Sequence, residues 1–370
     1  MKRLTLLLIL IGLLLSACTP AGNTTPTTAP TQAETKAPEP TEEPVQTTLT
    51  VMTHDSFAVS AELVEAFQKT NNVTINFVKA GDTGSALNRI ILTSLSGTPA
   101  ADVFFGLDNT FLSRALENDL FIPYQAPALK DVPADLQLDA DYRVVPIDFG
   151  DVCINYDKAY FEEKDIPLPE SLVQLKDPVY EGLLAVENPA TSSPGLSFML
   201  ATIAEFGEDG WLDWWAAMKE NSVVIVSDWE TAYYTNFSGS SGKGPQPMVV
   251  SYASSPAAEL IYSDPKLDVS PTAFIIAPNT CWRQVEFAGI LRGTKQQALA
   301  EKFIDFMLSP EFQADVPMQM FVYPVLSGVA LPAEFEEAAQ VPQDPAELDP
   351  ALIAANREAW TKAWSDLMLK

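Results

Sequence analysis

The sequence predicts an α/β fold of two lobes, each built on a doubly wound sheet, with a ligand cleft between the lobes. From Thr48 onward, short apolar runs alternate with helical patterns, which is typical of strands and helices around a parallel sheet. A second series of the same kind begins after Asp151. The roughly 320 residues after Thr48 suffice for two lobes at the usual domain size.

The first lobe is expected to open with strands and helices in alternation. Ser60 belongs to a residue type that caps helices, and it stands directly before the first helical pattern. We expect strands at 49–52, 73–78 and 102–105, and helices at 61–67, 87–92 and 111–116. The polar segments 81–84 and 106–109 are then loops that follow strands.

The chain is expected to cross to the second lobe in a strand at 151–156 and to return in a strand at 284–290. The second lobe contains expected strands at 183–186, 223–226 and 248–250 and helices at 196–206, 211–218 and 230–237, and it ends near 272–276. Helices at 296–308, 310–313 and 350–370 follow the return. The expected division is 48–150 for the first part of lobe 1, 151–282 for lobe 2, and 283–370 for the return to lobe 1 and the C-terminal helices. The crossings near 148–155 and 281–286 form a two-stranded hinge.

The first residues predict export. Lys2 and Arg3 precede an apolar run that closes in Leu-Ser-Ala-Cys at Cys18, so 1–17 form a signal peptide and Cys18 is the expected site of lipid attachment. The run is shorter than the roughly 20 apolar residues that span a bilayer. Residues 18–47 are rich in Thr and Pro and carry few large apolar side chains, which is typical of a disordered tether. We expect an extracytoplasmic protein that is anchored to the cell membrane by lipid.

The formal net charge of -27 makes nucleic acid an improbable partner and favours a cationic ligand. Plain solubility of an exported protein explains such a charge equally well. Cys153 and Cys281 are an even pair in an oxidising compartment, where a disulfide can form. Neither has neighbours at metal-ligand spacing, and no charge-relay set can be built around His54, the single histidine. We therefore expect no metal site and no catalytic site.

The loops after the strands are the expected ligand site, because ligands of open α/β sheets bind at the carboxyl ends of the strands. Ser193 can cap a helix that Pro194 opens, which leaves backbone amides free for a phosphate or a carboxylate. An ordinary helix cap explains the same residues. Aromatic side chains in or near these loops offer flat faces to a cationic ring: Trp229, Tyr233, Tyr234, Tyr252 and Trp282.

At these loops the sequence resembles the bacterial thiamine-binding proteins of ABC importers. The resemblance covers nearly all of 49–364, and its order and spacing are specific. The residues that carry it are Thr53-His54-Asp55-Ser56-Phe57, Gly106-Leu107-Asp108-Asn109, Ser192-Ser193-Pro194-Gly195-Leu196, Ser251-Tyr252 with Ser255-Pro256, Gln284-Val285-Glu286, Tyr323-Pro324-Val325 and Arg357-Glu358-Ala359-Trp360.

The resemblance implies a type II periplasmic-binding fold, a monomer, and partners that are the permease and the ATPase of a thiamine importer. It implies that the protein is no enzyme, needs no cofactor, and closes its lobes on thiamine or a thiamine phosphate. The ligand-binding residues that it implies are Asp82, Thr83, Ser192, Ser193, Trp229, Tyr252, Ala253, Ser254 and Ser255. Asp82 would accept a hydrogen bond from the aminopyrimidine, and the helix end would hold the hydroxyethyl or phosphate group.

Three positions depart from the family's pattern, because His54 and Ala258 replace tyrosines and Phe321 replaces a tryptophan. With less aromatic area, the pocket leaves room for another pyrimidine or thiazole compound. Cys153 and Cys281 fall at the two hinge crossings, where a disulfide would restrain opening. Ferric ion or a polyamine is a competing ligand on the same fold, suggested by Tyr233 and Tyr234. An exported hydrolase and a purely structural surface protein are weaker alternatives.

Overall fold

The computed structural model describes residues 47–95, 97–240 and 243–370. The expected signal peptide, Cys18 and almost all of the expected tether lie outside the described residues. Thr47, which we had assigned to the tether, is the first residue of a strand. Among the residues that the structure describes, no helix combines the length and apolar character needed to cross a bilayer.

Strands and helices alternate through the first half of the sheet, as the sequence predicts. The strands are β1 (Thr47–Thr53), β2 (Val73–Lys79), β3 (Val103–Asp108) and β4 (Phe121–Ile122), and the helices are α1 (Ala61–Asn71), α2 (Thr83–Ser94) and α3 (Leu112–Glu117). β1 lies between β2 and β3 and is parallel to both. Two details differ from the prediction. Gly106–Asp108 belong to β3 rather than to a loop, and the Ser60 hydroxyl bonds Asp315 instead of capping α1.

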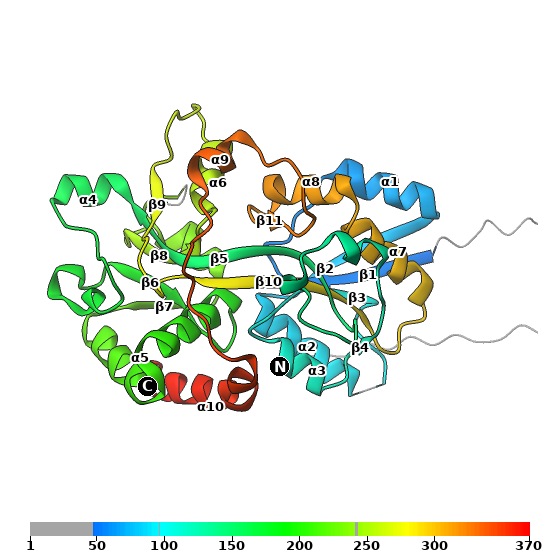
Figure 1. Ribbon diagram of the computed structural model, residues 1–370, viewed down its shortest axis with the longest axis horizontal. Coiled ribbons are helices and arrows are strands. Elements are labelled where there is room, and N and C mark those ends of the chain that lie inside the picture. The colour runs from blue at the N-terminus through cyan, green and yellow to red at the C-terminus, as the bar shows by residue number, and fades with distance from the viewer. Residues whose placement is uncertain (1–46, 96, 241–242) are drawn as a thin grey trace, which may run out of the picture. The chain divides into compact units, whose positions relative to one another are not determined.

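Two long antiparallel strands, β5 (Val145–Asp157) and β10 (Trp282–Leu291), connect the halves of the sheet. β10 pairs with β3 and β4 of the first half, and β5 pairs with strands of the second half. The hydrogen-bonded order is β2-β1-β3-β10-β5-β8-β6-β7, so the expected two sheets form one continuous path (Figure 1). The reason is that β10 pairs with strands of the first half, β5 pairs with strands of the second half, and the two crossing strands pair with each other.

The second half contains β6 (Leu184–Glu187), β7 (Val224–Val226), β8 (Met248–Tyr252) and β9 (Thr272–Phe274), with α4 (Lys158–Lys164), α5 (Ser193–Glu220), the π-helix η5 (Thr231–Asn236) and α6 (Ser255–Ile261). The helices expected at 196–206 and 211–218 are one element, α5, kinked at Gly207, whose φ of 68° is non-helical. α6 was missed, because we interpreted its first residues as a loop. Short 3-10 helices complete the connections: η1 (Pro127–Asp131), η2 (Ala134–Leu136), η3 (Gln174–Lys176) and η4 (Pro178–Tyr180).

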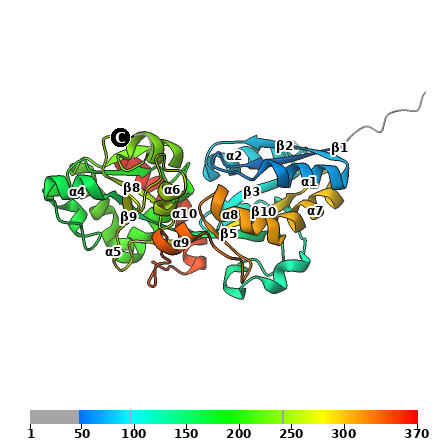
Figure 2. The same ribbon diagram turned by 90° about the horizontal axis from the view of Figure 1, so that it is seen from above.

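The C-terminal segment comprises α7 (Gln297–Met307), α8 (Pro310–Gln319), β11 (Tyr323–Pro324), α9 (Ala333–Ala338) and α10 (Pro350–Met368). The last helix, α10, packs on α5, and the Trp364 and Trp215 rings meet edge to face at 5.4 Å. Seen from above, β1–β3 with α1, α2 and α7 gather at one end of the unit, and α4, α5, β8 and β9 gather at the other (Figure 2). Both ends are covered by helices, and the crossing strands lie between them.

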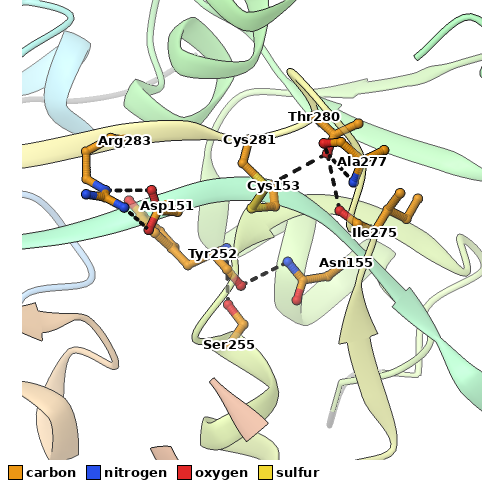
Figure 3. Close-up of a disulfide and its surroundings, with 10 residues drawn as sticks. All are labelled: Asp151, Cys153, Asn155, Tyr252, Ser255, Ile275, Ala277, Thr280, Cys281 and Arg283. Carbon is orange, nitrogen blue, oxygen red and sulfur yellow. Dashed lines mark hydrogen bonds and ion pairs between the residues drawn. A yellow bond between two sulfur atoms is a disulfide. The ribbon is translucent and has the colours of Figure 1, made fainter. Parts of the chain in front are cut away.

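A disulfide joins the two crossing strands at the point where they enter the second half. Cys153 in β5 and Cys281, directly before β10, are linked with an S–S distance of 2.09 Å across 128 residues of chain (Figure 3). Two residues further along each pairing, Arg283 Nε donates to Asp151 Oδ1 at 2.6 Å. A covalent bond and an ion pair therefore both hold β5 and the start of β10 together at this crossing.

Reduction of the disulfide is expected to lower the free energy of unfolding by about 2 to 4 kcal/mol, since the link restricts the unfolded chain over a long loop. Urea unfolding with and without reductant measures the difference. A double variant, Cys153→Ser with Cys281→Ser, serves as control and should not respond to reductant. Equal unfolding free energies for the oxidised and the reduced protein would contradict the expectation.

Candidate functional site

A pocket lies where strand ends of both halves of the sheet meet the crossing strands. The space not filled by protein atoms is about 630 Å³, open solvent at its mouth included. Its walls come from the loop after β1, the start of α2, the start of α5, η5, α6, β10 and the segment before β11. The lining residues are His54, Ser56, Asp82, Ser193, Pro194, Trp229, Tyr233, Tyr234, Tyr252, Ser255, Ala258, Glu286, Met320, Phe321 and Val322.

The structure brings together most of the residues that the sequence singles out. His54, Asp82, Ser193, Trp229, Tyr252, Ser255 and Phe321 all line the pocket. Thr83 and Ser192 are buried directly behind the wall, and Ser254 holds Phe321 in place through a 2.5 Å bond from its hydroxyl to the Phe321 carbonyl.

Two of the expected residues lie in the core instead. Ala253 packs with the disulfide and Phe274. Trp282, 4% exposed, pairs with Val152 in the sheet and joins the main hydrophobic core.

The start of α5 differs by one residue from the prediction. Ser192 is the N-cap, since its backbone is extended and its hydroxyl accepts from the Gly195 amide. Ser193 is the first helical residue, and its hydroxyl donates to the Asp108 carboxylate. The Ser193 hydroxyl is therefore already hydrogen-bonded to a carboxylate of the protein. The N-terminal end of the helix itself faces the pocket.

A chain of hydrogen bonds connects this helix end to both halves of the sheet. The Tyr252 hydroxyl donates to Gln284 Oε1 at 3.0 Å, and Gln284 Nε2 donates to Ser193 Oγ at 2.7 Å. Ser193 then donates to Asp108, whose other oxygen accepts from Thr110. β8, β10, α5 and β3 are thus held by one polar network, which forms the floor of the pocket.

Negative charge is concentrated around the pocket. Asp82 and Glu286 line it, and Asp108 and Asp148 are buried behind it. Burial raises the pKa of Asp108 to about 7, although hydrogen bonds from Thr110 oppose the shift. Burial, together with the charge of Glu286, also raises the pKa of Asp148 well above its usual value. Among the described residues that line the pocket, none is Lys or Arg.

His54 supplies the one basic side chain of the pocket wall. Its Nε2 lies 3.5 Å from Glu286 Oε2. Burial opposes a charged imidazole, but the attraction of Glu286 outweighs it, so the pKa of His54 is raised above 6.5. Gly106 permits this position, because a Cβ on Gly106 would lie 2.3 Å from His54 Cδ2.

Asp82 links the start of α2 to the opposite wall. Its Oδ1 caps α2 by accepting from the Thr83 amide at 2.8 Å, and its Oδ2 lies 3.4 Å from the Trp229 amide. Burial raises the pKa of Asp82. Asp82, which the sequence analysis assigns to ligand binding, therefore also caps α2.

Aromatic rings form the wall contributed by the second half. Trp229 stacks on Tyr233 at 5.1 Å and 16°, and it meets Tyr252 at 6.3 Å. Trp229 Nε1 donates to Ser251 Oγ at 2.9 Å, which fixes the indole. Carboxylates on one side and aromatic faces on the other suit a planar organic cation.

Sequence reasoning did not select several residues of this site. Three of these residues belong to segments that carry the family resemblance, namely Glu286, Asp108 and Gln284. That resemblance is the sequence signal that could have identified them. Ser56, Pro194, Met320 and Val322 carried no signal beyond their place in or near such segments.

Comparisons with known proteins show the family of the chain. Residues 98–346 match the family model described as "Bacterial extracellular solute-binding protein". The chain is 33% identical over 321 residues to the thiamine-binding periplasmic protein of Escherichia coli strain K12, which covers 85% of this chain and 92% of that relative. It is 29% identical over 323 residues to the thiamine-binding periplasmic protein of Brucella suis, covering 86% and 91%.

A solved structure titled "Periplasmic thiamin binding protein" superposes with a TM-score of 0.75 at 31% identity, covering 87% of this chain and 96% of that chain. The predicted fold class, an α/β two-lobed periplasmic-binding fold of type II, is confirmed by this likeness. The predicted family resemblance is confirmed as well.

The Asp108 carboxyl is expected to make the stability of the protein depend on pH. The pKa of Asp108 is 3.8 ordinarily and about 7 in the folded chain, so the folded chain binds this proton more tightly than the unfolded chain does. Proton binding at Asp108 therefore stabilises the fold at low pH. This stabilisation is lost as the pH rises from about 4 to about 7. Asp108→Asn cannot ionise. Between pH 5 and pH 8 the unaltered protein should lose about 1 to 3 kcal/mol of unfolding free energy relative to the variant.

Urea unfolding at the two pH values measures this loss. Asp264→Asn, on an exposed loop, is the control and should follow the unaltered protein. A pH dependence that is the same with and without Asp108→Asn would show that this carboxyl ionises normally.

Proposed function

Since the chain belongs to the bacterial extracellular solute-binding proteins, we propose that it captures thiamine or a thiamine phosphate in this pocket for an ABC importer. It is an extracytoplasmic binding protein and not an enzyme. The permease and the ATPase of the importer are the proposed partners. Lipid attachment at Cys18, a tether over 18–46 and a monomeric state belong to the same proposal.

The observation that carries the proposal is the pairing of carboxylates with aromatic faces in one pocket. Thiamine has a permanently charged thiazolium ring joined to an aminopyrimidine, so it offers a cation and two flat rings. Trp229 and Tyr252 offer faces, and Asp82 and Glu286 offer negative charge. A cation–aromatic contact contributes about 0.5 to 2 kcal/mol, and more where water is excluded.

The N-terminal end of α5 offers a binding position for the hydroxyethyl or phosphate end of the ligand. Ser193 and Pro194 line the pocket, and the N-terminal end of the helix dipole attracts an anion or an oxygen acceptor. The Ser193 hydroxyl is already bonded to Asp108, so a phosphate there competes with Asp108 for this hydroxyl. We therefore expect the free cation to bind at least as well as its phosphates.

Ferric ion is the weaker candidate. Burial and the nearby Glu259 carboxylate raise the pKa of Tyr233 well above 10, which disfavours the phenolate that iron needs. Within the part of the chain that the structure describes, no group of three or more His, Cys, Asp or Glu side chains is placed to hold a metal ion.

Isothermal titration of the purified, ligand-stripped protein with thiamine, its monophosphate and its diphosphate tests the proposal. Tight binding with one ligand per chain is the expected result, and the order of the three affinities reports on the start of α5. A titration with ferric citrate, followed by visible absorbance of a phenolate complex, is the comparison. Absence of heat with all three thiamine compounds would exclude thiamine as the ligand, while the assignments of family and fold would stand.

Closure of the pocket depends on a close approach at Gly84 in α2. A Cβ at this position would lie 2.8 Å from the Ala190 carbonyl oxygen and 2.9 Å from that of Thr191, on the opposite half. Both contacts are with backbone, which cannot rotate away as a side chain can. A side chain here would therefore hold the two walls apart.

Gly84→Ala is expected to weaken thiamine binding by about tenfold, because such a contact costs on the order of 1 to 3 kcal/mol. Gly210→Ala is the matched control, since its Cβ would meet Phe206 Cβ at an ordinary 3.6 Å in helix α5. Isothermal titration compares the variants, and X-ray scattering with ligand should show a less compact Gly84→Ala chain. Unchanged affinity in Gly84→Ala would mean that this contact is not required for binding.

A further inference from the structure

Three carboxyl groups stand side by side at the pocket, on three neighbouring strands. In the sheet register, Glu286 of β10 pairs with Asp108 of β3 on one side and with Asp148 of β5 on the other. Paired residues of neighbouring strands project to the same face of a sheet, so the three carboxyl groups form one acidic row. Asp108 and Asp148 are fully buried, and Glu286 is the member of the row that lines the pocket.

The two outer carboxyl groups of the acidic row favour their protonated forms. Burial raises the pKa of Asp108 to about 7, and burial together with the charge of Glu286 raises the pKa of Asp148 well above its usual value. A second negative charge beside Glu286 is costly where water is excluded. Glu286 is therefore the carboxylate that the row offers to a positive charge in the pocket.

The imidazole of His54 faces the same carboxylate. Its Nε2 lies 3.5 Å from Glu286 Oε2, is buried, and has no hydrogen-bond partner among the described residues. The ring packs against Phe105, with 5.5 Å between the centroids, and against Gly106, where a Cβ would come within 2.3 Å of His54 Cδ2. These contacts hold Nε2 toward Glu286 at the pocket wall.

Charged groups on the neighbouring elements act on this imidazole. Burial opposes its positive charge, whereas Glu286 and, after it, Asp82 at the start of α2 favour that charge. Lys79 at the end of β2 opposes the charge, and its ammonium donates to the Asp55 carbonyl at 2.5 Å, in the loop after β1. The balance raises the pKa of His54 above 6.5. In the free protein, His54 therefore supplies the positive charge opposite Glu286.

We propose that His54 and the cationic ring of the ligand compete for Glu286, so that binding of the cation displaces a proton from His54 to the solvent. The inference rests on the proposed function, in which thiamine brings a permanent positive charge into this pocket. Two positive charges beside one carboxylate repel each other, and a nearby cation disfavours the protonated form of histidine. His54 is thus a specificity-determining residue. When neutral it leaves Glu286 to a cation, and when protonated it occupies that carboxylate.

Nuclear magnetic resonance tests the competition directly, because the chain contains a single histidine and one imidazole therefore reports on His54. The purified, tag-free protein with isotopically labelled histidine is titrated from pH 5.5 to pH 8.5, with and without saturating thiamine. The pKa of His54 should be lower in the complex than in the free protein. A pKa that stays the same or rises on binding would overturn the proposal.

Isothermal titration of His54→Gln measures the consequence for affinity. The glutamine amide can donate to Glu286 in place of Nε2, but it cannot carry a charge. The imidazole binds its proton more tightly without the cation, so cation binding weakens as the pH falls through the pKa of His54. Between pH 8 and pH 6, the thiamine affinity of the unaltered protein should fall at least threefold more than that of His54→Gln.

Asp108→Asn is the comparison variant, since the pKa of Asp108 lies in the same range of pH. It should keep the loss of affinity that His54 causes. If Asp108→Asn removed this pH dependence and His54→Gln retained it, the displaced proton would come from the carboxyl group and the proposal would be wrong. The resonance measurement uses the unaltered protein, so the test does not depend on how well either variant folds.

The outcomes separate the two levels of the proposal. Thiamine binding without a lower pKa of His54 in the complex would overturn the competition and keep the proposed function. Absence of thiamine binding over the whole range of pH would overturn both.

Discussion

The pairing of β5 with β10 is the constraint on which the rest of the molecule depends. These two strands are the only described ones that join both halves of the sheet, and the Cys153–Cys281 link fixes their register where they enter the second half. Gln284 and Glu286 follow along β10 within a few residues, so the same register places both side chains at the pocket. A slip by one residue would turn them to the other face.

The site is built from groups that are costly to bury. Asp108 and Asp148 lie behind the pocket, and burial raises the pKa of both. A cation in the pocket offsets this cost, since an opposite charge a few ångströms away stabilises an ionised carboxylate. Well-packed parts of the molecule elsewhere also offset the cost of burying these carboxyl groups, for example the contact of Trp364 with Trp215 between α10 and α5. Ligand charge and the protein's own stability are therefore linked.

Local patterns predicted most elements and failed where tertiary contacts decide. The strands at β1, β2 and β6 and the helices α7 and α10 follow from apolar spacing and capping residues that act within a few positions. Gly106–Asp108 were expected as a loop because glycine and aspartate are rare in strands, yet β10 supplies their partners. Similarly, Ser60 has the chemistry of a cap, but the carboxylate of Asp315, distant in sequence, takes its hydroxyl.

The sequence by itself determined the fold class, the family and the strand-end loops that line the pocket, because these depend on periodicity and on contiguous motifs. Only the tertiary structure decided that Ser192 rather than Ser193 caps α5, that Trp282 faces the core, and that Glu286 meets His54. The physical reason is that these roles depend on side-chain direction and on neighbours many residues away, which no local pattern contains.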